Sequence, residues 1–296
     1  MLAWRDTHAR PGPTGIRAQS PNTDGSYLLI ELRDVTVAYP GTPSPAVEAV
    51  SCRFPDASVT ALVGASGSGK TTVLRTVNRM VTPTSGTVEV DGRDVADLDA
   101  VELRRSIGYV IQGSGLLPHR TVEANILTVP KLTGTEPAHG VEELARMVEL
   151  PVDLLRRYPG ELSGGQAQRV GVARALAHDP HILLMDEPFG AVDPVVRRSL
   201  QDLLAELQSR LRKTVVLVTH DMSEAFRLAD RILLLSAGGR IEQEGTPEEL
   251  LTAPASDHVR AFVGADARRL HLDDAGRVVR DARGRVIGTL DGGGRP

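Results

Sequence analysis

The segment Gly64-Ala-Ser-Gly-Ser-Gly-Lys-Thr71 carries residue types that can hold a phosphate group, and it matches G-x-x-x-x-G-K-[ST] at every fixed position. Glycine lacks a Cβ atom, so the backbone can take a positive φ and approach an anion closely. The N–H groups of such a turn, with the start of a following helix, form an anion-binding nest. Lys70 adds a positive charge for the β- and γ-phosphates, and the Thr71 hydroxyl can ligate Mg²⁺. The alternative is a turn of small residues that happens to contain a lysine.

The sequence on either side supplies the elements that this pattern requires. Residues 59–63 form a short apolar run rich in β-branched side chains, which predicts a strand, and residues 72–79 place apolar residues at helical spacing. A strand, a glycine-rich turn and a helix in this order favour a phosphate-binding loop. By itself the loop predicts only that a nucleotide phosphate binds.

Two acidic residues follow a second apolar run, Ile182-Leu-Leu-Met-Asp186, with Glu187 directly after it. An acid at the carboxyl end of a buried strand lies beside the phosphate loop in open parallel sheets. Asp186 is then placed to hold Mg²⁺ through water, and Glu187 to polarise an attacking water as general base. The alternative is a strand that ends in a solvated acidic turn.

The segment Leu162-Ser-Gly-Gly-Gln166 has the composition of a helix start, because Ser163 can cap the helix and Gln166 stands three residues later. Gly164 and Gly165 leave the first N–H groups accessible, which makes the turn a candidate anion site. An ordinary helix cap is the alternative.

Composition bounds the class of protein. The chain has 296 residues, 41% of them hydrophobic and only 3% aromatic, so its core must consist mainly of aliphatic side chains. A net charge of -4 argues against a protein held on nucleic acid by bulk charge. Cys52 is the only cysteine, which excludes a disulfide within the chain and a cysteine-based metal site. No apolar run approaches the length needed to span a bilayer.

Strand-like and helix-like segments alternate along the chain, which predicts an α/β domain with a mainly parallel sheet. The predicted strands are residues 28–39, 46–54, 59–63, 87–92, 107–111, 181–186 and 213–219, with a hairpin over 231–243. The predicted helices are residues 72–79, 98–105, 163–178, 194–212, 222–229 and 247–251, and residues 121–158 are expected to be mostly helical.

The order and spacing of these motifs resemble those of the nucleotide-binding subunits of ATP-binding cassette (ABC) transporters. The loop resembles their Walker A motif, residues 182–186 their Walker B motif, and residues 162–166 their signature. The resemblance covers about residues 28–266. It implies an α/β P-loop NTPase ABC cassette with a mainly parallel core sheet, an antiparallel β part and a helical subdomain at about 113–178. We expect a disordered leader at 1–27 and a short C-terminal tail at 267–296.

The resemblance also implies roles for single residues. Tyr39 falls where the family stacks an aromatic ring on adenine, and Gln112 where a glutamine lies near Mg²⁺ and the membrane partner. Asp193 fits the D-loop at 191–193, and His220 fits the switch histidine that contacts the γ-phosphate. The expected nucleotide-binding residues are Tyr39, Gly64, Ala65, Ser66, Gly67, Ser68, Gly69, Lys70, Thr71 and Thr72; the expected catalytic residues are Lys70, Gln112, Glu187 and His220; the expected Mg²⁺ ligands, partly through water, are Thr71, Gln112 and Asp186.

In that family two cassettes pair head to tail, with ATP between the loop of one copy and the signature of the other. This sequence has one loop and one signature, so a second copy is expected, with Ser163, Gly164, Gly165 and Gln166 acting in trans. The expected cofactors are ATP and Mg²⁺. The expected partners are membrane permease subunits and, indirectly, an extracellular or periplasmic solute-binding protein, with no nucleic acid. The expected location is the cytoplasmic face of the cell membrane.

Four segments, residues 112–125, 158–175, 188–194 and 262–266, look most like the quaternary-amine importer branch, which takes up glycine betaine, choline, carnitine or proline betaine. The alternatives are an importer ATPase for another small solute such as an amino acid or an anion, an exporter cassette, and a soluble ABC ATPase. Some members of the branch carry a C-terminal pair of CBS domains. Only 30 residues follow Asp266, so no full pair is expected, although residues 278–290 have the pattern of a small hairpin.

Overall fold

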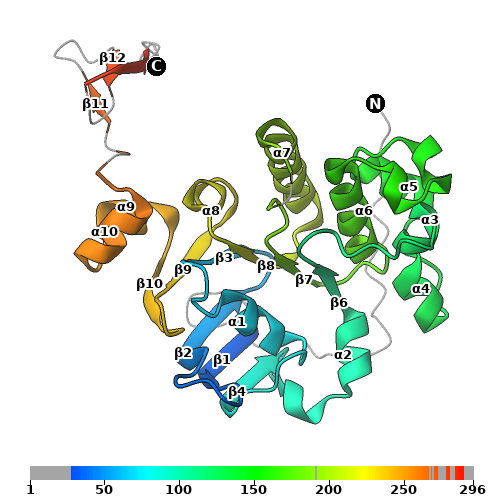
Figure 1. Ribbon diagram of the computed structural model, residues 1–296, viewed down its shortest axis with the longest axis horizontal. Coiled ribbons are helices and arrows are strands. Elements are labelled where there is room, and N and C mark those ends of the chain that lie inside the picture. Colours follow the sequence, from blue (N-terminus) through cyan, green and yellow to red (C-terminus); the bar gives the residue numbers. More distant parts are fainter. Residues whose placement is uncertain are drawn as a thin grey trace, which may run out of the picture.

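The strands that end at the predicted site belong to one six-stranded sheet in the computed structural model (Figure 1). Its strands, in spatial order, are β10 (Ile241–Gly245), β9 (Arg231–Leu235), β3 (Val59–Gly64), β8 (Thr214–Thr219), β7 (Ile182–Asp186) and β6 (Ile107–Val110). All neighbours pair in parallel except β10, which is antiparallel to β9. Every residue of β3, β7 and β8 is buried, as parallel strands covered on both faces require. The segments after β3, β6, β7 and β8 therefore meet at one edge.

A second sheet is antiparallel and has the order β2-β1-β4-β5. Its strands are β1 (Leu28–Val37), β2 (Val47–Pro55), β4 (Ser85–Val90) and β5 (Arg93–Asp94). The two sheets and the alternation of side chains along the buried strands divide the core into two clusters. Leu62 and Leu184 pack with β1, β2 and α1 (Lys70–Val77) on one face, whereas Val63 and Met185 pack with α6 and α7 on the other. These findings confirm the predicted α/β fold with its antiparallel part.

Helices cover the remaining faces. They are α2 (Ala100–Ser106), α3 (Val122–Ile126), α4 (Thr128–Thr133), α5 (Val141–Met147), α6 (Gly164–Leu176), α7 (Pro194–Leu211), α8 (Met222–Leu228), α9 (Pro247–Thr252) and α10 (Asp257–Val263), with 3-10 turns at Val95–Asp97, Val152–Arg156 and Pro159–Glu161. Helices α3 to α6 gather at the β6 end of the sheet (Figure 1). The bounds of a helical subdomain at about 113–178 stay a prediction. Within the described chain, no helix is both long and apolar enough to span a membrane.

The structure describes residues 28–190, 192–266, 268, 270–272, 278–280 and 284–289. The predicted leader at 1–27 and residue 191 of the D-loop lie outside these ranges. Near the C-terminus, β12 (Val278–Arg280) pairs antiparallel with β13 (Val286–Thr289), in agreement with the hairpin predicted there, and β11 (His271–Leu272) adds a third strand.

Candidate active site

The phosphate loop connects β3 to α1 with the backbone geometry that its glycines allow. Gly67 and Gly69 have φ angles of 78° and 86°, a region that favours glycine. A Cβ atom added to Gly69 would lie 2.3 Å from the carbonyl oxygen of Ala46, so this position has no room for a side chain. Ala65, Ser66 and Gly67 form the exposed tip of the loop, and α1 begins directly after Gly69.

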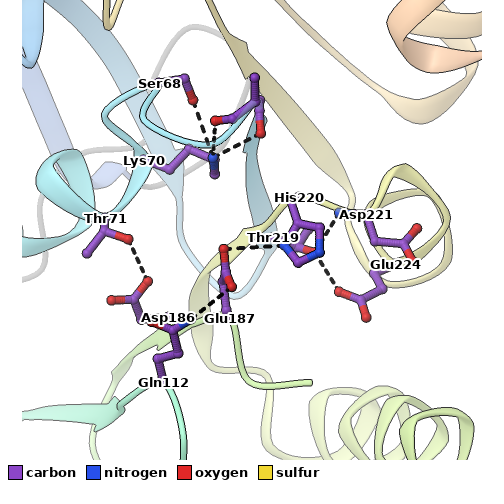
Figure 2. A network of polar contacts seen from close by, with 12 residues as sticks. Ser68, Lys70, Thr71, Gln112, Asp186, Glu187, Thr219, His220, Asp221 and Glu224 are labelled. Carbon is purple, nitrogen blue, oxygen red and sulfur yellow. Dashed lines mark hydrogen bonds and ion pairs between the residues drawn. The ribbon is translucent and has the colours of Figure 1, made fainter. Parts of the chain in front are cut away.

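The Lys70 ammonium group lies inside the loop rather than in solvent (Figure 2). Its Nζ donates hydrogen bonds to the carbonyl oxygens of Gly64 at 2.9 Å and Ala65 at 2.7 Å, and to Ser68 Oγ at 3.3 Å. Burial lowers the pKa of Lys70, and the charges of Glu187 and Asp186 oppose that shift. The loop backbone therefore holds this positive charge where the phosphate pattern predicts it.

The Asp186 carboxylate joins the loop to the central sheet. Thr71 Oγ1 donates to Asp186 Oδ1 at 2.8 Å, and the carboxylate is almost fully buried at the end of β7. Its other oxygen, Oδ2, lies 3.4 Å from both the Arg75 guanidinium and the Tyr109 hydroxyl. The hydroxyl and carboxylate oxygens at this position are hard ligands of the kind that Mg²⁺ prefers.

Arg75 and Tyr109 are site neighbours that the motifs did not reveal. Arg75 stands one helical turn after Thr71 on α1, so the two side chains share a face. Tyr109 lies on β6 and is paired in register with Leu184 of β7. The spacing of four residues from Thr71 on a helix is a sequence signal that places Arg75 near the site. For Tyr109 the corresponding signal is the pairing of β6 with β7, which is known only from the structure.

Glu187 is held between side chains from two neighbouring strands. Gln112, two residues after β6, donates through Nε2 to Glu187 Oε2 at 3.1 Å. His220, directly after β8, places Nδ1 3.3 Å from Glu187 Oε1 (Figure 2). Because β7 lies between β6 and β8, the three residues meet at the carboxyl edge of the sheet. The chemistry that this group supports is the orientation of a water molecule beside a carboxylate base.

The backbone of Glu187 is strained. Its φ angle is 45°, which costs a residue other than glycine about 1–3 kcal/mol. The Glu187 N–H donates to the Val218 carbonyl at 3.0 Å, and its own carbonyl accepts from the Gly190 N–H at 3.1 Å. These two bonds fix the turn that directs the carboxylate toward Gln112 and His220.

Tyr39 lies at the outer side of the loop. Its hydroxyl is 3.4 Å from Thr72 Oγ1, and 43% of the residue is exposed. The structure thus places the predicted adenine-stacking ring beside the first turn of α1.

The signature residues form a separate site within the chain. Ser163 Oγ accepts from the Gln166 N–H at 3.3 Å, and Gln166 Oε1 accepts from the Ser163 N–H at 2.9 Å, which is a complete capping box. Ser163 and Gly164 are exposed. In the described part of the chain, no hydrogen bond joins this turn to the phosphate loop.

The signature turn packs against the start of α7. A Cβ atom added to Gly165 would lie 2.3 Å from Val196 Cγ1, so the two helices meet here without a gap. Asp193 of the predicted D-loop caps α7 by accepting from the N–H groups of Val195 and Val196 at 3.1 Å. The D-loop aspartate and the signature are therefore neighbours.

The sequence and the fold were compared with known proteins. The ABC transporter family profile matches residues 47–190. OsmV of Salmonella typhimurium, an osmoprotectant import ATP-binding protein, is 48% identical over 84% of this chain and 68% of its own length. OpuCA of Bacillus subtilis, a glycine betaine/carnitine/choline transport ATP-binding protein, is 47% identical over 80% and 63%. YehX of Escherichia coli, a glycine betaine uptake system ATP-binding protein, is 48% identical over 74% and 72%.

Solved structures agree with these relatives. The bacterial ABC transporter cassette MJ0796, solved as a dimer, has a TM-score of 0.67 and 35% identity over 74% of this chain and 99% of its own. Its post-hydrolysis state with ADP and Pi has a TM-score of 0.66. The chain spans roughly two thirds of the length of the relatives named above, 63% to 72%. Since one relative at 48% identity is covered over 72% of its length, this chain belongs to the ABC transporter family, as one of its ATP-binding cassette ATPases.

Proposed function

We propose that this chain is the ATP-hydrolysing subunit of an importer for quaternary ammonium osmoprotectants, such as glycine betaine, choline or carnitine. The observation that carries the solute assignment is that relatives at 45–48% identity are named for the import or transport of these compounds. The hydrolytic part is supported by the position of Glu187 between Gln112 and His220.

In the proposed reaction a water molecule attacks the γ-phosphorus of ATP, the bond from that phosphorus to the β–γ bridging oxygen breaks, and ADP and inorganic phosphate are the products. Glu187 takes the proton of that water, while Gln112 and His220 hold the carboxylate and contact the nucleotide. Lys70 and the N–H groups of the loop stabilise the negative charge that develops on the phosphate oxygens. Thr71, Asp186 and Gln112 would hold Mg²⁺, partly through water, and the ion would neutralise phosphate charge.

The proposed site is complete only in a pair of cassettes. Ser163, Gly164, Gly165 and Gln166 of a second copy would close over the nucleotide bound to the loop of the first. This is supported by the signature turn, whose side-chain hydrogen bonds stay within its own capping box, and by the dimeric form of the cassette MJ0796. We expect the pair to dock on permease subunits at the cytoplasmic face of the membrane and to be served by a solute-binding protein.

Reconstitution tests this proposal. The chain is co-purified with its genomic-neighbour permease, placed in vesicles and supplied with the binding protein loaded with choline or glycine betaine. We expect the ATPase rate to rise with the loaded binding protein and not with the empty one. Stimulation by an amino acid or an anion instead would contradict the solute assignment. Stable isolation without any membrane partner, together with no solute-stimulated ATPase activity in vesicles, would contradict transport.

A further inference from the structure

A buried carboxyl group lies behind His220 and belongs to none of the motifs discussed above. Glu224, on the first turn of α8, is 6% exposed and lies beside Thr219 at the end of β8 (Figure 2). Thr219 Oγ1 donates to Glu224 Oε2 at 2.5 Å, and Gln201 Nε2 donates to Oε1 at 3.3 Å. Arg197 Nε lies 3.8 Å from the same Oε1. Three side chains from two other elements thus converge on this carboxyl group.

The cluster is costly to keep buried. Burial raises the pKa of Glu224, and the hydrogen bond from Thr219 opposes that shift. Removing a carboxylate from water is unfavourable unless its lone pairs are satisfied, but a satisfied buried network fixes one geometry of the elements around it. Gln201 and Thr219, at 7% and 1% exposure, are as buried as Glu224.

The geometry that the cluster fixes is the turn that carries His220. The Thr219 hydroxyl donates to Glu224 and at the same time accepts from the Asp221 N–H at 3.0 Å. Asp221 in turn caps α8 by accepting from the Ser223 N–H at 2.7 Å. His220 lies between Thr219 and Asp221, and its side chain is 62% exposed, so the turn rather than surrounding side chains sets its position.

The same cluster joins this turn to α7, which also packs on the signature helix. Gln201 and Arg197 belong to α7, whose first turn carries Val196 against Gly165. Farther along, Arg169 of α6 donates to Ser199 of α7 at 2.8 Å. A displacement of α7 relative to the sheet would therefore pull on Glu224.

We propose that Glu224 is a positioning residue for hydrolysis: it ties α7 to the turn at residues 219–221 and so holds His220 against Glu187. The proposal rests on the proposed hydrolytic role of His220 and Glu187. It adds a structural connection from helices α6 and α7, which pack together at the signature, to the turn that carries His220.

The first test replaces Glu224 by glutamine in the full-length chain. Glutamine keeps the size of the side chain, but its amide has a single acceptor oxygen for the hydrogen bonds from Thr219 and Gln201 and no charge to attract Arg197. We expect kcat to fall about tenfold or more, since misplacing a catalytic group by about 1 Å can cost about 10²-fold, while KM and the MgATP dissociation constant stay within about twofold. The matched control is Glu248→Gln, an exposed acid in the first turn of α9, which should change nothing.

A double-mutant cycle with His220→Ala separates positioning from general stability. If Glu224 acts through His220, Glu224→Gln causes no further loss of the single-turnover rate in the His220→Ala background. Losses that multiply would overturn the proposal, and so would an unchanged kcat in Glu224→Gln. If Glu224→Gln does not fold, Thr219→Val and Thr219→Ser replace it: only Val should lower kcat, and equal kcat values would overturn the proposal. A wild-type chain that hydrolyses no ATP would overturn the proposed function as well, whereas an active wild type with multiplying losses overturns only this inference.

Discussion

Glu187 combines a strained backbone with a side chain that contacts both Gln112 and His220. In Glu187→Gln the amide can still bond to Gln112 and His220 but cannot take a proton from water. We expect ATP binding to be retained and the hydrolysis rate to fall by about 10²–10⁴-fold, the usual contribution of a general base. Phosphate release and nucleotide binding are measured on the same preparation, and size exclusion in ATP should reveal a trapped pair of cassettes. Normal turnover would remove Glu187 as the base.

Lys70 holds its charge inside the loop through three acceptors, so its loss is expected to affect binding rather than catalysis alone. Hydrogen bonds to charged groups are worth about 1.5–3 kcal/mol, so Lys70→Ala should weaken ATP binding by about 10- to 100-fold and abolish hydrolysis. Titration with a fluorescent ATP analogue measures the affinity. Lys131→Ala, an exposed lysine on α4, is the control. Tight ATP binding by Lys70→Ala would show that Lys70 does not bind the phosphates of ATP.

At the scale of single residues, the motifs contain the side chains that contact one another at the site, but not the neighbouring side chains that pack against them. Lys70, Asp186, Glu187 and His220 could be placed from the motifs and from their positions directly after predicted strands. Tyr109 and Glu224 could not. Tyr109 contacts Asp186, which lies 77 residues away in the sequence, and Glu224 contacts Gln201, which lies on another helix. Contacts of this kind are set by strand order and helix packing, which a single sequence does not display.

At the scale of elements, the buried strands were predictable because parallel strands read as continuous apolar runs. The predicted strands at 59–63, 181–186 and 213–219 agree within one residue with β3, β7 and β8. The individual helices within residues 121–158 were harder to predict, because they are only five to seven residues long and are separated by turns. Helix α10 (Asp257–Val263) was not predicted; Val259 and Val263 lie one turn apart as its buried face, a pattern too short to stand out.

The contact between α6 and α7 at Gly165 leads to a prediction for this pair of helices. In Gly165→Ala the new methyl group would meet Val196 at 2.3 Å, so the helices must separate or Val196 must move. Overpacking of this kind costs about 1–3 kcal/mol, so the melting temperature should fall by several degrees, together with the hydrolysis rate. Gly160→Ala, where no atom lies within 4 Å, is the control. Equal melting temperatures in calorimetry would mean that the helices adapt without cost.

At the scale of the whole molecule, each chain is proposed to contribute half of two sites. Lys70, the expected Mg²⁺ ligands and the proposed base lie within one copy, while the exposed signature turn makes its side-chain hydrogen bonds within its own capping box. Binding should therefore be a property of the single chain and hydrolysis a property of the pair. The specific ATPase activity is expected to rise with protein concentration, whereas the affinity for ATP is not.

Mixing two inactive variants tests this division directly. Lys70→Ala has a defective loop and an intact signature, and Gly164→Asp has an intact loop and a carboxylate that repels phosphate at the signature. Each variant alone forms pairs in which both sites are defective. In a mixed pair, one site joins the intact loop to the intact signature, so an equimolar mixture should recover up to about a quarter of wild-type activity if pairing is random. An exposed-surface variant such as Lys131→Ala mixed with wild type gives the reference rate. No recovery on mixing would mean that loop and signature do not meet across two copies.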